Sequence, residues 1–349
     1  MNKRHFLKSC TVLGAGALLA PAAQAIGVPQ QSTLATLKPK ALPTDATIGI
    51  ASPSAATAEH KDIILAQQLI KALGYRVKLS PHIMARRGHL AGLDQQRADD
   101  LNGFFADPNV DAIVCLRGGS GAARILPLLD YPIIKANPKP LLGYSDITAL
   151  HNALLAKTGL ISFHGPNATS QWNPFNVHQF KQLFVHRERV LYQNLDKADD
   201  ELVNRHYLTQ TITSGQSQGH LIGGNLSVLS ALAGSDYLPN FEGAILFLED
   251  IDEAPYRIDR MMSTLKLLGA LDKINGFVFG DCNQCQPGSG YGSLTLEQVL
   301  ADYIAPLNIP AYHGAMIGHI ERQFILPVGA QVKLDADQGS IRVLEEVFS

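Results

Sequence analysis

The chain has 349 residues, with 29 lysines and arginines against 31 aspartates and glutamates, and a formal net charge of −2. This length allows about two domains with ample core. The balanced charge gives no reason to expect a nucleic acid or an anionic membrane surface as partner. Beyond the N-terminal region, no apolar run is long enough to cross a bilayer.

The N-terminus differs in composition from the rest of the chain. A basic start containing Lys3-Arg4 precedes a stretch of small apolar residues, and Ala23-Gln24-Ala25 fits the A-x-A pattern of a cleavage site. This order is typical of a bacterial export signal, so we expect residues 1–25 to be a signal peptide and the mature protein to be periplasmic. A membrane anchor is the alternative, but the apolar run is short for one. Lys3-Arg4 is similar to a twin-arginine signal with lysine in the first arginine place, which leaves the export route open.

After a proline-containing linker at residues 26–43, segments with strand and helix periodicity alternate as far as residue 175. The predicted elements are strand 46–52, helix 58–73, strand 75–79, helix 95–105, strand 110–116, a helix from 122, strand 140–143, helix 146–157 and strand 160–163. This alternation predicts an N-terminal α/β domain over residues 44–175, with a parallel sheet covered on both faces. Ligands of such sheets bind beyond the carboxyl ends of the strands.

The remainder of the chain is richer in strands. Residues 176–217 are polar and irregular, and we interpret them as an inter-domain linker. A smaller, β-rich C-terminal α/β domain is expected over residues 218–349. Its predicted elements are a helix after Asn225, strand 243–248, helix 255–268, strand 276–279, strand 311–317 and a terminal hairpin around 337–339.

The segment from Pro140 to Ile147 has the layout of a nucleophile elbow, in which a buried strand turns sharply at a serine into a helix. Gly143-Tyr144-Ser145 carries the first glycine of the pattern G-x-S-x-G, but Ile147 replaces the second. A serine at a helix start is also a common N-cap. The pattern alone therefore leaves Ser145 either as a nucleophile or as a cap.

A serine nucleophile needs a histidine to take its proton and a carboxylate to orient that histidine. Glu249 and His319 each end an apolar predicted strand, and with Ser145 they follow the order Ser, Glu, His of α/β-hydrolases. The site would then lie between the two domains, a usual place for a cleft. His164 also follows a strand and is an alternative base. The carboxylates that compete with Glu249 are Asp250, Asp252 and Glu253.

A glycine-rich turn from Arg117 to Gly121 stands at the end of another predicted strand. We expect an oxyanion hole from the N–H groups of Gly118 or Gly119 and of Asp146. A phosphate cradle is the alternative use of such a turn.

Cys282 and Cys285 form a C-x-x-C pair. In an exported protein this pair can be a disulfide. Without a second pair or nearby histidines it is weak evidence for zinc. We predict a structural loop; a redox role is the alternative, but the pair does not open an evident helix.

Several motifs, in this order, resemble those of the LD-carboxypeptidases, a family of serine peptidases that includes the microcin-immunity hydrolases. They are Arg117-Gly118-Gly119-Ser120-Gly121, Gly143-Tyr144-Ser145-Asp146, Phe163-His164-Gly165-Pro166, Gly223-Gly224-Asn225-Leu226, Leu248-Glu249-Asp250 and Gly318-His319. The resemblance runs from about Ile48 to near the C-terminus. Many family members have an aromatic residue at the place of Ser120, which leaves the detailed substrate preference open.

The resemblance implies that Ser145 is the nucleophile, Glu249 the charge-relay carboxylate and His319 the general base, with no metal or cofactor and with a homodimeric assembly. It implies a muropeptide substrate from which terminal D-alanine is released. Two other functions remain open: hydrolysis of a toxic peptide conjugate, and a non-enzymatic periplasmic solute-binding protein. The last would not need the three side chains to lie together.

Overall fold

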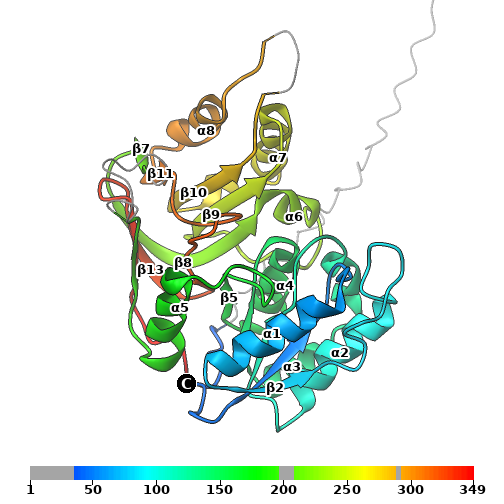
Figure 1. Ribbon diagram of the computed structural model, residues 1–349. Coiled ribbons are helices and arrows are strands. Elements are labelled where there is room, and N and C mark those ends of the chain that lie inside the picture. Colours follow the sequence, from blue (N-terminus) through cyan, green and yellow to red (C-terminus); the bar gives the residue numbers. More distant parts are fainter. Residues whose placement is uncertain (1–34, 196–207, 288–291) are drawn as a thin grey trace, which may run out of the picture. The chain divides into compact units, whose positions relative to one another are not determined.

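The computed structural model describes residues 35–195, 208–287 and 292–349 (Figure 1). The expected signal peptide and the first part of the linker lie outside the described residues. Two sheets with their helices make up the described part, and no helix in it is long and apolar enough to cross a membrane. The predicted fold class, a parallel-sheet α/β domain followed by a β-rich α/β domain, is confirmed.

The first sheet has the strand order β12-β5-β4-β3-β1-β2. Its strands are β1 (Thr47–Ala51), β2 (Arg76–Leu79), β3 (Ala112–Cys115), β4 (Leu141–Gly143), β5 (Ser162–His164) and β12 (Leu326–Val328). Strands β1 to β5 pair in parallel, whereas β12 runs antiparallel to β5. Its helices are α1 (His60–Ala72), α2 (Asp94–Ala106), α3 (Tyr131–Ala136), α4 (Thr148–Thr158) and the 3-10 turns η1 (Ala122–Leu128) and η2 (Ser145–Ile147).

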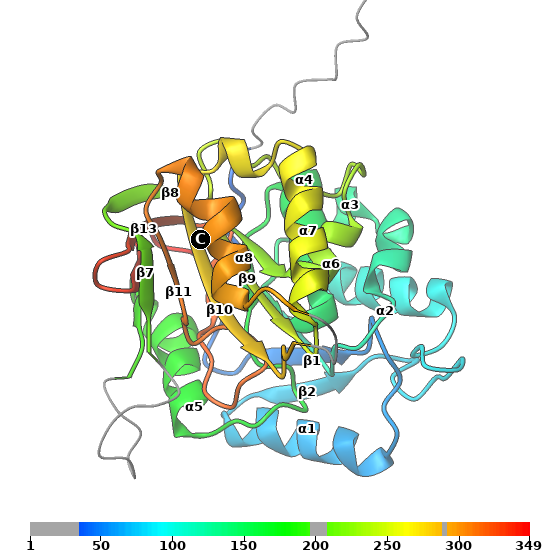
Figure 2. The ribbon, with the colours of Figure 1, turned by 90° about the horizontal axis from the view of Figure 1, so that it is seen from above.

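The second sheet has the order β6-β14-β13-β8-β9-β10-β11-β7, in which β8 to β11 are parallel. Its strands are β6 (Leu191–Gln193), β7 (Gln210–Thr213), β8 (Gln216–Asn225), β9 (Ile245–Ile251), β10 (Gly276–Asn283), β11 (Ala311–His313), β13 (Gln331–Asp335) and β14 (Ser340–Val343). The helices are α6 (Leu226–Ala231), α7 (Pro255–Leu267), α8 (Leu296–Ile304), η4 (Leu271–Lys273) and η5 (Ala305–Leu307). Figure 2 shows α6, α7 and α8 along β9 and β10, and their apolar faces share one buried cluster with these strands.

Three predicted elements differ from the structure. The helix expected from residue 122 is a 3-10 helix, because Pro127 lies inside it and cannot donate an α-helical hydrogen bond. The strand expected over 311–317 stops at His313, where Gly314 turns the chain with a φ of 85°. His319 therefore lies in a loop beyond β11. The strand expected over 243–248 runs on to Ile251 as β9, so Glu249 lies within a strand and does not end it.

The segment 176–217, expected to be a linker, also contributes regular structure. It contains most of α5 (Pro174–Phe180), the π-helical turn η3 (Lys181–Val185) and two strands of the second sheet, β6 and β7. The described part of the first expected linker is packed too, since Leu37 forms a β-bridge to Leu160 and Leu42 is buried. Both segments are polar in overall composition, but their few apolar side chains pack against the rest of the fold.

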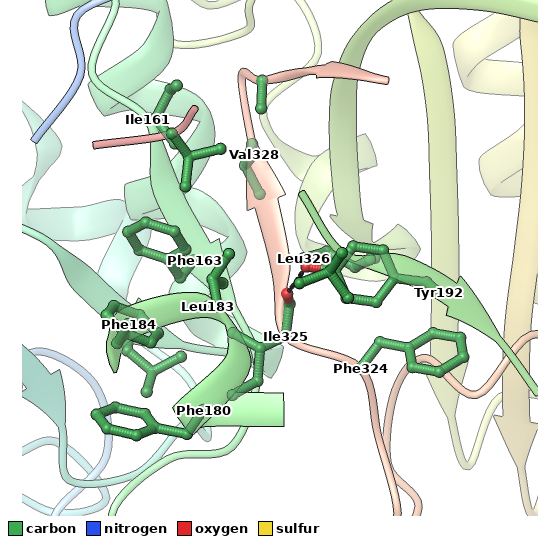
Figure 3. Close-up of a cluster of buried hydrophobic side chains, with 14 of the residues drawn as sticks. Ile161, Phe163, Phe180, Leu183, Phe184, Tyr192, Phe324, Ile325, Leu326 and Val328 are labelled. Carbon is green, nitrogen blue, oxygen red and sulfur yellow. Dashed lines mark hydrogen bonds between the residues drawn. The ribbon is translucent and has the colours of Figure 1, made fainter. Parts of the chain in front are cut away.

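A buried aromatic cluster joins this segment to β5 and β12 (Figure 3). Phe163 on β5 contacts Phe184 with ring centroids 4.6 Å apart, and Phe184 stacks on Phe180 at the same distance. The hydroxyl of Tyr192 on β6 donates a 2.5 Å hydrogen bond to the carbonyl of Ile325, the residue before β12. Because β12 pairs with β5, this cluster secures the chain where it passes from one sheet to the other.

Candidate active site

Ser145 lies on a strained turn directly after β4. Its φ is 65°, in the left-handed region that non-glycine residues seldom adopt, and it opens the turn η2 that leads into α4. Gly118 approaches it closely: a Cβ at this glycine would lie 2.8 Å from Ser145 Cβ and 3.0 Å from Oγ. The geometry is that of a nucleophile elbow, and only glycine fits the position opposite the serine.

The carboxylate of Asp146 fixes the elbow to two neighbouring loops. It is buried and accepts a 2.5 Å hydrogen bond from Ser54 Oγ and a 2.7 Å bond from the backbone N–H of Ala122. Within the described chain, no hydrogen bond uses the N–H groups of Gly118, Gly119 or Asp146 as donors. These three groups, expected from the sequence to bind an oxyanion, therefore have no competing acceptor.

His319 and Glu249 form a close pair. The imidazole Nδ1–H donates to Glu249 Oε2 at 2.8 Å, and Glu249 is fully buried while the His319 side chain is 14 % exposed. Gly318 allows this approach, because its φ is 114° and a Cβ there would lie 2.6 Å from Glu249 Oε2. Asn283 Nδ2 donates to the His319 carbonyl at 2.8 Å and holds the loop to β10.

The charge around His319 favours its protonated form. Burial opposes the imidazolium, but the hydrogen bond and the negative charge of Glu249 outweigh it, with smaller contributions from Asp250 and Asp281. The pKa of His319 is therefore raised above its ordinary value. A base of higher pKa has a stronger drive to accept a proton from a hydroxyl.

The imidazole of His319 lies against the elbow. Its ring centroid is 4.9 Å from that of Tyr144, the residue before Ser145. Since Nδ1 faces Glu249, Nε2 is the nitrogen left for an incoming proton. Among the described residues, no hydrogen bond joins Ser145 Oγ to this ring, so the structure places the His319 ring beside the elbow without a Ser–His hydrogen bond.

The acidic residues that compete with Glu249 are engaged elsewhere or exposed. Asp250 accepts hydrogen bonds from Asn225, Ser227 and the Ile251 N–H, and burial raises its pKa to about 6. Glu253 pairs with Arg257 at 3.3 Å. Asp252 is exposed. Only Glu249 of these four carboxylates is bonded to His319 in the described chain.

His164, the alternative base, is fully buried at the end of β5. Burial holds its pKa well below the ordinary value, aided by the nearby His151 and His319. An imidazole of such low basicity is a poor acceptor for a serine proton. The environment of His164 therefore disfavours it as the base.

Sequence reasoning assigned no role to the residues that link the elbow helix to the second sheet. Thr148 Oγ1 on α4 accepts a 2.9 Å hydrogen bond from the Asn225 N–H, and Asn152 Nδ2 donates to the Gly223 carbonyl at 3.0 Å. A Cβ at Gly224 would lie 2.4 Å from Thr148 Oγ1. The motif Gly223-Gly224-Asn225 was visible in the sequence as a helix start, but its partner on α4 lies more than seventy residues away.

Cys282 and Cys285 are joined by a disulfide at the end of β10. Across the described residues, no cluster of three or more histidine, cysteine or acidic side chains has the arrangement of a metal site.

The elbow serine, its free amides and the imidazole–carboxylate pair define the class of a serine hydrolase. Comparison with known proteins narrows this class. A family model for the LD-carboxypeptidase N-terminal domain matches residues 48–165, and one for the LD-carboxypeptidase C-terminal domain matches residues 218–334. The chain belongs to the LD-carboxypeptidase family and is a serine-type carboxypeptidase.

Named relatives are similar over most of the chain. A probable murein peptide carboxypeptidase of Bacillus subtilis is 38 % identical over 85 % of this chain and 91 % of its own length. A murein tetrapeptide carboxypeptidase of Pseudomonas aeruginosa is 32 % identical over 85 % of this chain and 95 % of its own. The solved structure of MccF with glutamyl sulfamoyl guanosine matches with a TM-score of 0.80 and 27 % identity, over 90 % of this chain and 100 % of that one.

Proposed function

We propose that this protein releases terminal D-alanine from murein tetrapeptides, with Ser145 as nucleophile, His319 as general base and Glu249 as the carboxylate that orients it. The 2.8 Å bond between His319 Nδ1 and Glu249 Oε2, beside the elbow, carries the proposal. It fixes the tautomer in which Nε2 is the free acceptor. The murein tetrapeptide carboxypeptidase of Pseudomonas aeruginosa supports the choice of substrate.

In this mechanism Ser145 Oγ attacks the carbonyl of the amide between an L-configured centre and D-alanine. His319 Nε2 takes the hydroxyl proton and passes it to the leaving amino group, so that an ester forms on Ser145 and D-alanine departs. Water, deprotonated by the same imidazole, then hydrolyses the ester. The amides of Gly118 or Gly119 and of Asp146 would bind the oxyanion, a contribution of about 10²–10³ in rate for one donor.

Ser145 and His319 need not be hydrogen-bonded in the free protein, since such bonds commonly tighten only when substrate is bound. The test is mass spectrometry of purified murein tetrapeptide after incubation with the protein. Wild type should yield tripeptide and D-alanine, and Ser145→Ala should yield neither at an unchanged melting temperature. His319→Ala should abolish turnover, and retained turnover in either variant would remove that residue from its role.

A second candidate is hydrolysis of a toxic peptide conjugate, which the similarity to MccF favours. Incubation with an aminoacyl sulfamoyl nucleoside separates the two: cleavage of that compound and not of the tetrapeptide would select this function. A non-enzymatic solute-binding function is not in keeping with membership of a peptidase family.

We further propose that the protein acts in the periplasm, as a homodimer. The N-terminal composition supports export, and the family resemblance supports the dimer. Cell fractionation tests the first, with a cytoplasmic pool of full-length protein as the opposing result. Light scattering on the purified protein tests the second.

A further inference from the structure

One oxygen of Glu249 faces a second imidazole. His164 Nε2 lies 4.0 Å from Glu249 Oε1, whereas Oε2 is the oxygen bonded to His319. Both side chains are completely buried. In the part of the chain that the structure describes, neither ring nitrogen of His164 nor Glu249 Oε1 has a hydrogen-bond partner.

Two unpaired polar groups that face each other inside a protein are unusual, because nearly all buried polar atoms are hydrogen-bonded. The separation is about 1 Å beyond an ordinary hydrogen bond. Tyr144 and Phe247 enclose the imidazole, with ring centroids 6.1 and 5.2 Å away. Glu249 offers an unused acceptor to this ring.

The protonation state of His164 follows from its surroundings. The titratable groups that face it are Glu249, His151, His319 and Tyr144. Burial and the two neighbouring histidines keep its pKa far below neutral, so the ring is uncharged and carries one N–H. His151 cannot be its partner, because its own nitrogens are bonded to the Gly143 carbonyl and to Ser162 Oγ, both at 2.8 Å.

We infer that His164 is a positioning residue for the proposed reaction: its uncharged ring directs Nε2–H at Glu249 Oε1 and holds the carboxylate so that Oε2 stays in line with His319. Glu249 would thus lie between two imidazoles, one that moves protons and one that does not. The inference rests on the proposed role of the Glu249–His319 pair. His164, which the sequence offered as an alternative base, thus has a positioning role.

The sign of the effect distinguishes positioning from simple packing. An N–H dipole directed at a carboxylate stabilises its charged form, as a donated hydrogen bond does, and so lowers its affinity for protons. Loss of that donor raises the proton affinity of the coupled Glu249–His319 pair, whichever member takes the proton. The acid limb of the pH–rate profile, where activity falls as the pair takes up a proton, should therefore move to higher pH by about 0.5–1 on the pH scale. A cavity or a packing defect lowers the rate without moving this limb.

The experiment compares three substitutions. His164→Phe and His164→Leu remove the donor, while His164→Gln keeps an N–H near the Nε2 position. The rate of Ser145 labelling by a fluorophosphonate and the rate of D-alanine release are both measured against pH. The donor-less variants should lose about 10- to 100-fold in rate with little change in KM and a raised acid limb, and the glutamine should restore the limb. His151→Gln is the matched control for loss of a buried imidazole, and its limb should stay in place.

An acid limb unmoved in the donor-less variants, with labelling of wild type intact, would overturn the inference and leave the proposed function standing. Absence of labelling in wild type would instead refute the nucleophile and with it the proposed function. If the donor-less variants do not fold, ¹⁵N NMR of the wild-type imidazoles decides. His164 should be the Nε2–H tautomer throughout the neutral range, and an Nδ1–H tautomer would overturn the inference.

Discussion

Glu249→Gln replaces the carboxylate bonded to His319 Nδ1 with an uncharged amide of almost the same volume. The wild-type bond is 2.8 Å long and joins a completely buried carboxylate to an imidazole. A hydrogen bond to a charged group is worth about 1.5–3 kcal/mol, and one pKa unit corresponds to about 1.4 kcal/mol. The substitution should therefore lower the pKa of His319 and move the acid limb to lower pH by about 1–2 on the pH scale. The side-chain N–H groups of the glutamine can also donate to Nδ1 of His319, which favours the tautomer with its proton on Nε2. Because Nε2 can then no longer accept a proton, kcat should fall by about 10²–10⁴.

The assay is the pH dependence of D-alanine release, with fluorophosphonate labelling as a readout that does not depend on the substrate. Glu253→Gln is the matched control, since this acid pairs with Arg257, and its acid limb should not move. Stability supplies a second measurement. The raised pKa of His319 means that the pair stabilises the fold fully below the unfolded value of about 6.5 and loses this contribution as pH rises through the folded pKa. The unfolding free energies of wild type and Glu249→Gln should differ most in acid. An acid limb that stays in place or rises would refute the reasoning.

Three further substitutions test other parts of the site. Gly118→Ala should abolish turnover with a small loss of stability, because the added Cβ would lie 2.8 Å from Ser145 Cβ. The measurements are kcat and the melting temperature. Normal turnover in this variant would contradict the elbow geometry. Gly318→Ala should cost about 1–3 kcal/mol in stability and reduce kcat, because position 318 requires a φ of 114° and the added Cβ would meet Glu249 Oε2 at 2.6 Å. Denaturant unfolding measures the loss of stability. Gly74→Ala is the control, because φ is also positive there but an added Cβ meets nothing. Asp250, with its pKa raised to about 6 by burial, binds more protons when folded than unfolded. The stability of wild type relative to Asp250→Asn should therefore fall by about 3 kcal/mol as pH rises from about 4 to 6, and a flat difference would show that the carboxyl is not desolvated.

Strands β1 to β5 of the first sheet could be predicted because their signals are local. Apolar runs such as Val110 to Leu116 and the helical spacing after Ser145 each lie within one element, and Gly159 ends α4 with a φ of 78°. Strands β7 and β8, which begin with polar residues, were not predicted, and neither were the three-residue strands β6 and β12. What holds them is tertiary, such as the bond from Tyr192 to the Ile325 carbonyl.

The residues of the site also differ in how far the sequence predicts them. Ser145 was recognisable from its turn, whereas the choice of Glu249 over three neighbouring acids depends on the direction of β9, where successive side chains point to opposite faces. Two residues in line along a strand, Glu249 and Asp250, thus meet different partners: His319 for one, and Asn225 with Ser227 for the other. No spacing rule in the sequence gives that parity before the register of β9 is known.

That register has a consequence for how the site is kept together. Ser145 belongs to one sheet and the His319–Glu249 pair to the other, and α4 spans the junction through its bonds to Asn225 and Gly223. Asn225 bonds both to Thr148 beside the elbow and to Asp250 beside Glu249. A shift of β9 by one residue would replace Glu249 with Asp250 at the imidazole and break the second of these bonds. Through its backbone N–H and its side-chain Nδ2, Asn225 therefore couples the position of Ser145 to that of Glu249. This explains why a helix-start motif far from Ser145 in the sequence forms part of the same site.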